Sequence, residues 1–348
     1  MIGPSISANG GIASVVKEYY KAHIDEKCNL LYLSSTNSEN FIRKNLCFIK
    51  ACLIAPQKLK ECDIVHIHMS KSGSFFRKKF FVKKAKKYEK PVIIHIHSSQ
   101  FNDFYEKSSP FVKKQIIGTF EKADRIIVLS DYWKKEYSHF SKPEKMIVIE
   151  NGVVIPKKFE KDYNKPSIIF LGKICKEKGI YDLLKAVSIL KNQFPEIKLK
   201  ICGLGEIDNC KEICKKYRIE QNVDFLGWVL GEEKRHLLEE SAIFVLPSYY
   251  EGMPVSLIEA MSYGCCCVSS NVGGIPDVLN DKCGIMFNSG KVEELVDSLT
   301  EVLKSEAIRE KLGKEAYLIV QKRFDESLVI DKIISIYKEV LNGNKNKT

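Results

Sequence analysis

Short apolar runs alternate with helical patterns along this chain, and the alternation constrains the fold more than any other feature. The first-half runs are β-branched and apolar on both faces, as buried parallel strands are. They occupy residues 63–69, 91–97, 125–130 and 146–152. Helical patterns lie between them or ahead of them, at residues 14–22, 75–88 and 110–122. Repeated strand, helix and strand predict a parallel sheet with right-handed crossovers.

A polar stretch at residues 156–166, with two prolines, interrupts this pattern and indicates a domain boundary. The pattern then restarts, with strands expected at residues 167–172, 197–203, 223–227, 242–248 and 265–270 and a helix at 179–194. From about residue 292 to 341 the chain is helical, with breaks near Ser305 and Phe324. A length of 348 residues suits two domains rather than one core.

The expected fold is therefore α/β, with two doubly wound, Rossmann-like domains that face a central cleft. The first domain spans residues 1–160 and the second spans 161–323. The C-terminal helix and tail, 324–348, are expected to cross back to the first domain, with a frayed end from residue 342. Ligands of doubly wound sheets bind beyond the carboxyl ends of the strands, so we expect the functional site there.

The positive charge of the chain is concentrated in its first half. Residues 1–164 contain 29 Lys and Arg against 17 Asp and Glu, whereas residues 165–348 contain 26 against 27. A basic half predicts an anionic partner: a phosphate ligand, nucleic acid or a membrane surface. The 12 scattered cysteines, and a start without the basic and apolar segments of a signal peptide, indicate a cytoplasmic protein with reduced thiols. No apolar run reaches the roughly 18 residues of a membrane-spanning helix.

Two glutamates lie close together in the stretch PSYYEGMPVSLIEAMSYG, residues 247–264. Glu251 follows the carboxyl end of an expected strand, and Pro254 suits the first turn of the next helix. Glu259 then falls inside that helix, whose N-terminal N–H groups would point at a bound ligand. The simpler alternative is that Glu251 caps the helix and Glu259 pairs with a lysine.

Three lysines follow another expected strand, in the stretch FLGKICKEKGIYDLL, residues 170–184. The strand ends at Gly172, and Lys173, Lys176 and Lys178 precede a glycine and a helix. Cations at a helix N-terminus oppose the helix dipole, so the arrangement is favourable when an anion lies among them. A diphosphate would fit, with each lysine acting as a point charge. A solvated basic loop is the alternative.

In chain order these motifs resemble those of the retaining family 4 glycosyltransferases, which have the GT-B fold. The matching segments are GK…KEKG, VDFLGWV, PSYYEGMPVSLIEAMSYG and NVGGIPDVL in the second half, and NGGIASVV, PVIIHIHSSQF, ADRIIVLSD and VIENGV in the first. Glu251 and Glu259 satisfy the family's pattern of a glutamate, seven residues and a glutamate. Only eight residues, beginning MIGPS, precede the glycine segment of the first half, which predicts a short first strand.

The resemblance implies a role for each matching position. Glu251 would hold hydroxyls of the donor sugar, and Glu259 the ribose hydroxyls of the nucleotide. Lys173 and Lys178 would bind the diphosphate, with lysine at the first position where the family commonly has arginine. His97 matches a histidine near the transferred sugar. The other implied donor-binding positions are Gly10, Gly11, Gly172, Trp228, Val229, Gly252, Met253, Pro254 and Val255.

By this resemblance we expect a retaining glycosyltransferase that moves a sugar from a nucleoside-diphosphate donor, UDP rather than GDP. The acceptor would be a glycan or a lipid-linked glycan in surface polysaccharide biosynthesis. The family needs no bound metal and the chain has no DxD pair at a strand end, so we expect neither metal nor cofactor. Alternatives within the GT-B fold are an epimerase, a phosphorylase or a nucleotide-sugar binder without transferase activity.

Two HIH pairs, His66 with His68 and His95 with His97, suggest a rival function. Residues i and i+2 of a strand share a face, so each pair could hold a metal ion, as in a metal-dependent hydrolase. Carboxylate ligands at matching spacing are missing. We therefore interpret His66, His68 and His95 as buried or site-lining groups.

A basic segment runs from Arg77 to Lys90, with eight basic residues, one acidic residue and several phenylalanines nearby. It is typical of an amphipathic helix that packs its aromatic side chains and solvates its lysines. The alternative is docking on an anionic membrane surface, on the inner face of the plasma membrane, which would suit a lipid-linked acceptor. No nucleic-acid-binding motif accompanies the charge, so nucleic acid is not an expected partner.

Overall fold

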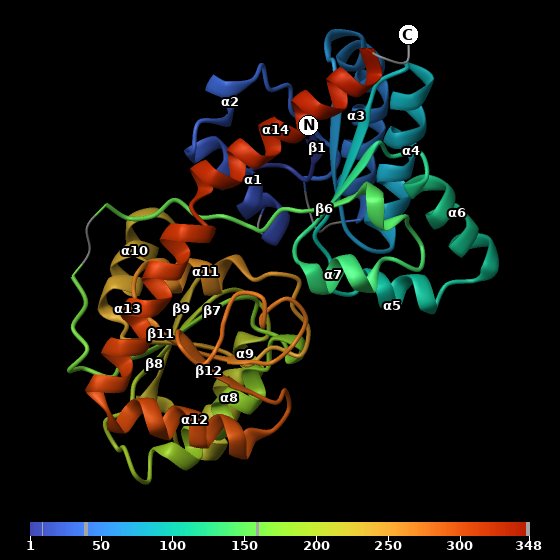
Figure 1. The fold of residues 1–348 in the computed structure, drawn as a ribbon. Helices are drawn as coiled ribbons and strands as arrows, with labels where there is room; N and C mark the ends of the chain where they lie inside the picture. Colours follow the sequence, from blue (N-terminus) through green and yellow to red (C-terminus); the bar gives the residue numbers. More distant parts are fainter. Residues whose placement is uncertain (9, 38–40, 158–159, 346–348) are drawn as a thin grey trace. The chain divides into compact units, whose positions relative to one another are not determined.

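The computed structural model describes residues 1–8, 10–37, 41–157 and 160–345. They form two compact units: unit 1 is Met1–Val154 with Glu326–Thr348, and unit 2 is Ile155–Asp325. Each unit contains one six-stranded parallel sheet surrounded by helices (Figure 1). The sequence analysis placed the corresponding boundaries after residues 160 and 323.

Unit 1 has the strand order β2-β1-β3-β4-β5-β6. Its strands are β1 (Ile2–Gly3), β2 (Leu33–Ser34), β3 (Val65–Met69), β4 (Val92–Ile96), β5 (Arg125–Val128) and β6 (Met146–Val148). Its helices are α1 (Gly11–Lys21), α2 (Ile24–Lys27), α3 (Phe41–Glu61), α4 (Gly73–Lys87), α5 (Phe101–Glu106), α6 (Pro110–Phe120), α7 (Asp131–Glu136) and α14 (Glu326–Lys345), with a 3₁₀ turn η1 (Pro143–Lys145). Every residue of β3 and β4 is buried, including His66, His68 and His95.

Unit 2 has the strand order β12-β11-β10-β7-β8-β9. Its strands are β7 (Ile168–Leu171), β8 (Leu199–Cys202), β9 (Val223–Gly227), β10 (Ile243–Leu246), β11 (Cys266–Ser270) and β12 (Gly284–Phe287). Its helices are α8 (Ile180–Leu190), α9 (Ile207–Tyr217), α10 (Gly231–Glu240), α11 (Val255–Ser262), α12 (Val292–Lys304) and α13 (Glu306–Arg323), with 3₁₀ turns η2 (Lys176–Lys178) and η3 (Glu220–Asn222). The chain reverses direction across this sheet beside β7, since β8 and β10 pair with its two edges.

The nine strands predicted from the sequence are confirmed, each within a few residues of its expected bounds. The predicted breaks near Ser305 and Phe324 separate α12, α13 and α14. The first strand is short, as predicted. The sequence analysis missed β2, β12 and the long helix α3, because β2 is only two residues long, β12 begins at a glycine, and α3 contains Pro56.

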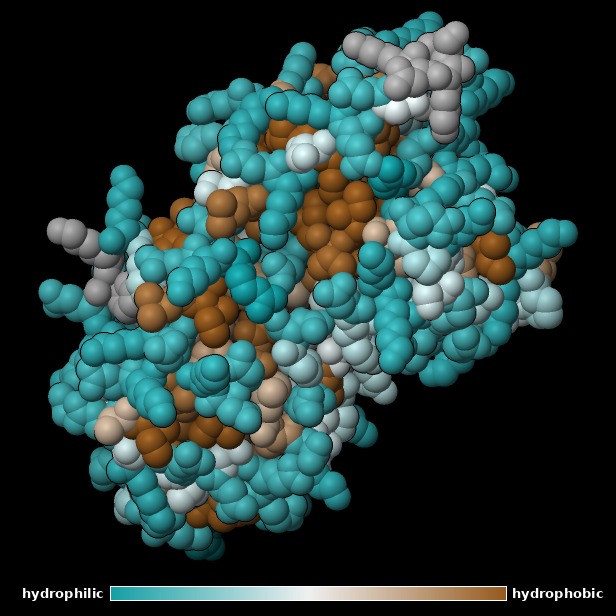
Figure 2. Space-filling view, in the orientation of Figure 1, coloured by the Kyte–Doolittle hydropathy of each residue, from teal (hydrophilic) through white to brown (hydrophobic). Residues whose placement is uncertain are grey.

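The surface of the described residues is mainly hydrophilic in the view of Figure 2, with hydrophobic residues visible in places. Within the described part of the chain, no helix combines the length and the apolar character needed to cross a bilayer. The C-terminal tail, expected to be frayed, lies partly outside the described residues. Asn9 of the glycine segment also lies outside them.

Candidate active site

The topology of unit 2 identifies where a ligand would bind. β7 lies between β8 and β10, so the chain leaves β7 on one side for β8 and β9 and later returns on the other side for β10 to β12. This is a topological switch point, and ligands of doubly wound sheets bind at the carboxyl ends of the two strands that flank it. Both constellations singled out in the sequence begin there, one after β7 and one after β10.

A left-handed glycine joins the two constellations. Gly179, just after η2, has φ +69°, and a Cβ at this position would lie 1.9 Å from the carbonyl oxygen of Pro247. The backbone N–H of Tyr249 also donates to the carbonyl oxygen of Glu177 at 2.9 Å. The start of α8 is therefore held against the loop that follows β10, and only glycine permits so close an approach.

Glu251 is buried in that loop, and its Oε1 atom accepts two hydrogen bonds. Ser248 Oγ donates at 2.7 Å and Lys178 Nζ donates at 2.5 Å. The side chain of Glu251 is 7% exposed and that of Lys178 is 28% exposed, so the ion pair is largely removed from water. Glu251 does not cap α11, whose N-cap residue is Pro254 and has no side-chain cap, so the capping part of the simpler alternative is wrong.

Glu259 lies in α11 and forms an ion pair with Lys234 of α10, as the simpler alternative expected. Both side chains are partly exposed, at 17% and 23%. The pair therefore remains accessible to a polar ligand and is not a core contact.

The loop that leads into α11 is fixed by a second loop. The backbone N–H of Gly274 donates to the carbonyl oxygen of Gly252 at 3.1 Å. Met253 is buried, and α11 begins at Val255, one residue after Pro254. The first N–H groups of an α-helix have no intrahelical acceptor, so this end of α11 presents donors that suit an anion.

The remaining predicted residues of unit 2 lie at the ends of β7 and β9. Lys173 is exposed directly after β7, and the backbone N–H of Gly172 donates to the carbonyl oxygen of Cys202 at 3.0 Å. After β9, Val229 is buried, whereas Trp228 is partly exposed. Its indole Nε1–H is buried and has no acceptor among the described residues. A buried unpaired donor is unfavourable, so this indole is suited to a ligand acceptor.

Sequence reasoning missed several residues that fix this site. Ser248 ends the expected strand of residues 242–248, so its position at the switch point was a usable signal. Its carbonyl oxygen accepts from Ser270 Oγ at 2.5 Å, which anchors the loop to β11. Tyr249 donates through its hydroxyl to Asp182 Oδ2 at 2.7 Å, and this hydrogen bond raises the pKa of Tyr249 to about 12. No sequence motif identified Lys234 as the partner of Glu259, because the pairing depends on how α10 and α11 pack.

In unit 1, the glycine pair lies at the start of α1. Gly10 is the N-cap residue with φ +145°, a conformation that side chains rarely adopt, and Gly11 is the first helical residue. Apart from the adjoining residues and the helix's own backbone, no described atom lies within 4 Å of a Cβ built at either glycine. The space above this helix end is thus open to a ligand, and the required backbone conformation explains a glycine at position 10.

His97 follows β4 and belongs to a cluster of four histidines on one face of β3 and β4. His68 and His95 are paired across the two strands, and His66 and His97 lie two positions away along each strand. His97 Nε2 lies 2.8 Å from His68 Nδ1. Burial lowers the pKa of His97 to about 3. The ring is therefore neutral at pH 7 and can exchange hydrogen bonds but cannot act as a cation.

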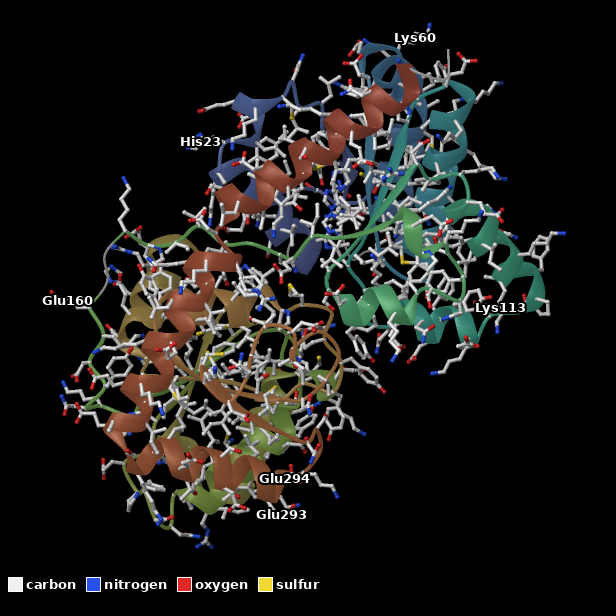
Figure 3. The ribbon with its side chains drawn as sticks, viewed as in Figure 1. His23, Lys60, Lys113, Glu160, Glu293 and Glu294 are labelled. Carbon is white, nitrogen blue, oxygen red and sulfur yellow. The ribbon has the colours of Figure 1, made fainter. Side chains whose placement is uncertain are left out.

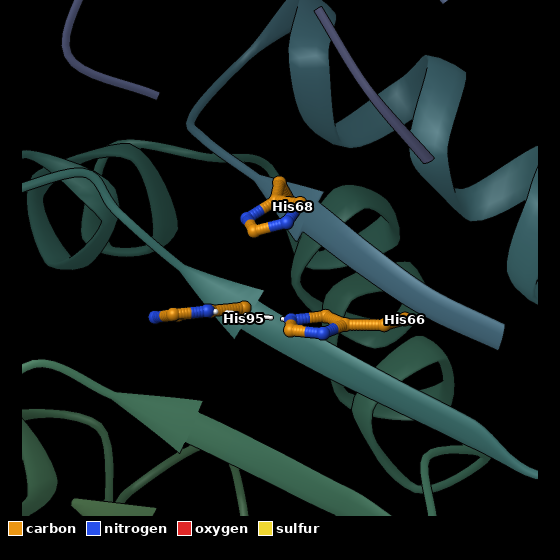
Figure 4. Close-up of side chains that lie close together, drawn as sticks. All are labelled: His66, His68 and His95. Carbon is orange, nitrogen blue, oxygen red and sulfur yellow. Dashed lines mark hydrogen bonds between the residues drawn. The ribbon is translucent and has the colours of Figure 1, made fainter. Parts of the chain in front are cut away.

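The other three histidines of the cluster are almost fully buried. Their side chains lie close together (Figure 4). His66 Nε2 lies 3.3 Å from His95 Nδ1, and the Tyr337 hydroxyl of α14 lies 2.6 Å from His66 Nδ1. Burial holds the pKa of each of these histidines well below its ordinary value. One nitrogen from each of the three lies within 4.8 Å of the others, so His66, His68 and His95 are the described residues that could hold a metal ion.

This histidine cluster matches a metal site only in part. Neutral imidazoles are the form that binds transition metals, and tetrahedral zinc with bonds of about 2.1 Å places ligand nitrogens about 3.4 Å apart. The His66–His95 distance agrees with that spacing, and the Nε2 atoms of His68 and His95 have no partner among the described residues. No carboxylate belongs to the group.

Two family models match adjacent stretches of the chain. The model described as Glycosyltransferase Family 4 matches residues 27–155, and the model described as Glycosyl transferases group 1 matches residues 154–318. The second match contains the whole switch-point site of unit 2.

Individual relatives agree with the family models. The uncharacterized glycosyltransferase YqgM of Bacillus subtilis is 28% identical over 229 residues, which are 64% of this chain and 64% of YqgM. The capsular polysaccharide biosynthesis glycosyltransferase CapM of Staphylococcus aureus is 24% identical over 65% of this chain and 64% of CapM. Each match thus spans less than two thirds of the relative's own length.

Among solved structures, HepE of Anabaena, crystallised with UDP and glucose, superposes with a TM-score of 0.79. It is 15% identical and the match covers 97% of this chain and 98% of HepE. At this identity the likeness concerns the fold, and it confirms the predicted α/β class. Together with the family models, these matches show that the chain belongs to the group 1 glycosyltransferases of GT-B fold.

Proposed function

We propose that this protein transfers a sugar from a nucleoside-diphosphate donor to a glycan or lipid-linked glycan during surface polysaccharide biosynthesis. The observation that carries the proposal is the buried Glu251, held by Lys178 and Ser248 where β7 and β10 end. A carboxylate and an ammonium group side by side at a switch point suit a ligand with both hydroxyl and phosphate groups. CapM, a capsular polysaccharide enzyme, supports the polymer class, and HepE, solved with UDP, supports UDP as the nucleotide.

The donor would be bound through groups of unit 2. Both hydrogen bonds to Glu251 reach Oε1, which leaves Oε2 to accept hydrogen bonds from the sugar hydroxyls. Lys178 has three N–H donors, so it can bind a phosphate while it remains paired with Glu251. Lys173 is an exposed cation on the same loop. Glu259 would accept from the ribose hydroxyls, and Trp228 would contact the base.

The chemistry then requires stabilisation of the leaving diphosphate. Negative charge develops on it as the glycosidic bond breaks, and preorganised cations and helix N-terminal N–H groups stabilise that charge. In unit 2, Lys173, Lys178 and the start of α11 would supply these groups. His97, being neutral, would donate or accept a hydrogen bond with the transferred sugar. We assign no protein nucleophile, and we propose retention of configuration without a bound metal.

Thermal unfolding with UDP, GDP, ADP and dTDP, each with and without EDTA, tests the proposal. A ligand at about 100 times its Kd stabilises the folded state by about 2.7 kcal/mol, which is a shift of several degrees. We expect UDP to raise the Tm equally with and without EDTA. If no nucleotide shifts the Tm, the donor assignment is wrong.

The histidine cluster favours a second candidate, a metal-dependent hydrolase, because His66, His68 and His95 meet in one place. Loss of stability in EDTA alone, restored by zinc, would support that function over the transferase. Release of UDP that depends on an added acceptor would separate a transferase from an epimerase or a nucleotide-sugar binder, because these release none.

A further inference from the structure

Helix α3 carries an apolar stripe on its exposed side. Leu46, Ile49 and Leu53 are 61%, 55% and 77% exposed, and Ile42, one turn earlier, is 68% exposed. Spacings of four, three and four residues place the four side chains on one face of an α-helix. The buried side of the helix is formed by Ala51, Ala55 and Leu59. The helix is thus apolar on two faces, one of which packs on unit 1 and one of which faces solvent.

The neighbouring helix α4 extends this surface. Phe48 of α3 contacts the rings of Phe80 and Phe81 edge to face, with centroids 6.0 and 5.9 Å apart. Phe80 is itself partly exposed. Lys83 and Lys87 lie three and seven positions after it, on the same face of α4, and both are exposed. Aromatic groups therefore lie beside the apolar stripe and lysines lie farther along the same helix.

Almost all the excess charge of unit 1 is found on this part of the chain. Residues 41–90 contain 14 Lys and Arg against three Asp and Glu, whereas the whole of unit 1 contains 30 against 18. Lys50, Lys83 and Lys87 form no ion pair with described residues. Lys60, at the end of α3, is labelled in Figure 3. The surface combines exposed apolar side chains with uncompensated positive charge.

Not every lysine of the basic segment contributes. Lys78 is buried and donates to Ser35 Oγ, and Lys86 is paired with Asp124 at 2.5 Å. The segment from Arg77 to Lys90 is therefore only partly a solvated face. The exposed apolar groups lie on α3, a helix that the sequence analysis did not identify.

We propose that the exposed face of α3, with the exposed lysines of α3 and α4, docks on an anionic phospholipid bilayer. Leucine and isoleucine side chains would enter the boundary between headgroups and acyl chains, and the lysines would bind the phosphate headgroups. A nucleic acid or a soluble anionic glycan matches the charge but provides no apolar phase for four exposed aliphatic side chains. Docking on a membrane rests on the proposed function, since it would bring the enzyme to a lipid-linked acceptor. The test of docking needs neither donor nor acceptor.

The test is co-sedimentation of the full chain with vesicles of phosphatidylcholine alone or of phosphatidylcholine and phosphatidylglycerol in equal parts. Two double variants probe the two components: Leu46→Ser with Leu53→Ser, and Lys83→Gln with Lys87→Gln. The matched controls change exposed residues of unit 2 in the same way: Ile189→Ser with Leu318→Ser, and Lys211→Gln with Lys215→Gln. UDP-dependent thermal stabilisation is measured on every variant, which shows that it is folded and tests the donor site separately.

We expect the wild type and both controls to bind the anionic vesicles and not the neutral ones. The lysine variant should partition about 30-fold less, since each lysine near an anionic surface contributes about 1 kcal/mol and 1.4 kcal/mol is tenfold. The serine variant should lose at least about tenfold. Absence of wild-type binding to anionic vesicles, or serine-variant binding equal to wild type, overturns the proposal. The proposal is also overturned if immobilised DNA retains the wild type and the serine variant equally while neither binds to vesicles. That result would indicate that the surface binds a soluble polyanion.

Discussion

Removing the charge of Glu251 should separate sugar transfer from nucleotide binding. The carboxylate is 7% exposed, and its Oε1 accepts hydrogen bonds from Ser248 and Lys178. Glu251→Gln keeps the shape of the side chain but leaves the Lys178 ammonium without its counter-ion. Under the proposed function the sugar hydroxyls also lose a charged acceptor, whereas the contacts to base and ribose are unchanged.

The size of the effect follows from the hydrogen bonds of Glu251. A hydrogen bond to a charged group contributes about 1.5–3 kcal/mol, so loss of one in the transition state lowers kcat by about 10- to 150-fold. Breaking a fully buried ion pair costs about 3–5 kcal/mol. Because Lys178 is 28% exposed, we expect a smaller loss of folding stability, about 1–2 kcal/mol, and a Tm lower by about 2–8 °C.

The assay measures acceptor-dependent UDP release for kcat and isothermal calorimetry for the Kd of UDP. Glu251→Ala should abolish transfer and leave the Kd of UDP nearly unchanged. Ser248→Ala is the matched control, since it removes one hydrogen bond and keeps the charge, and it should lower kcat by less than tenfold. Full turnover in Glu251→Ala, or a loss of UDP affinity as large as the loss of kcat, would refute the sugar-holding role.

Three further changes test other parts of the structure. Glu259→Gln should weaken UDP binding by about 10- to 100-fold, because two ribose hydroxyls lose a charged acceptor; an unchanged calorimetric Kd contradicts the assignment. Gly179→Ala should destabilise unit 2 by more than about 2 kcal/mol in urea unfolding, because its Cβ would meet the carbonyl oxygen of Pro247. The control is Gly118→Ala, in open space within α6, which should be neutral or stabilise the protein by up to about 1 kcal/mol. Burial lowers the pKa of His97 from 6.5 to about 3, so the stability due to its neutral form is full above pH 6.5 and is lost as the pH falls toward 3. Urea unfolding from pH 7.5 to 5.5 should therefore show that the free energy of unfolding falls less steeply in His97→Asn than in the wild type, by up to about 1.4 kcal/mol per pH unit below 6.5. Identical slopes would refute the neutral ring.

Much of the fold was readable from the sequence because its signals are local. A buried parallel strand such as β7 needs apolar residues on both faces, and this requirement is visible in residues 168–171 alone. The C-terminal helices could be divided correctly because their breaks are also local, at Ser305 and Phe324. Helix α3 was not predicted because its solvent-exposed face is apolar and Pro56 interrupts the helical pattern. Its sequence therefore differs from that of an ordinary surface helix.

The candidate site was predictable as a set of positions but not as a set of contacts. The resemblance named Glu251 and Lys178, 73 positions apart, and assigned them to different parts of the donor. It gave no indication that they would pair with each other. That pairing depends on Gly179, whose missing side chain lets the start of α8 reach the loop after β10.

The sequence by itself therefore determined most of the elements, the two-unit α/β architecture and the residue types available for chemistry, because periodicity, turns and motifs act over short distances. Only the tertiary structure decided which of those residues meet. It paired Lys178 with Glu251, gathered four histidines on one face of β3 and β4, and left the apolar stripe of α3 exposed. The physical reason is that burial and pairing are properties of the assembled sheets and their packed helices, which bring together residues that no local pattern connects.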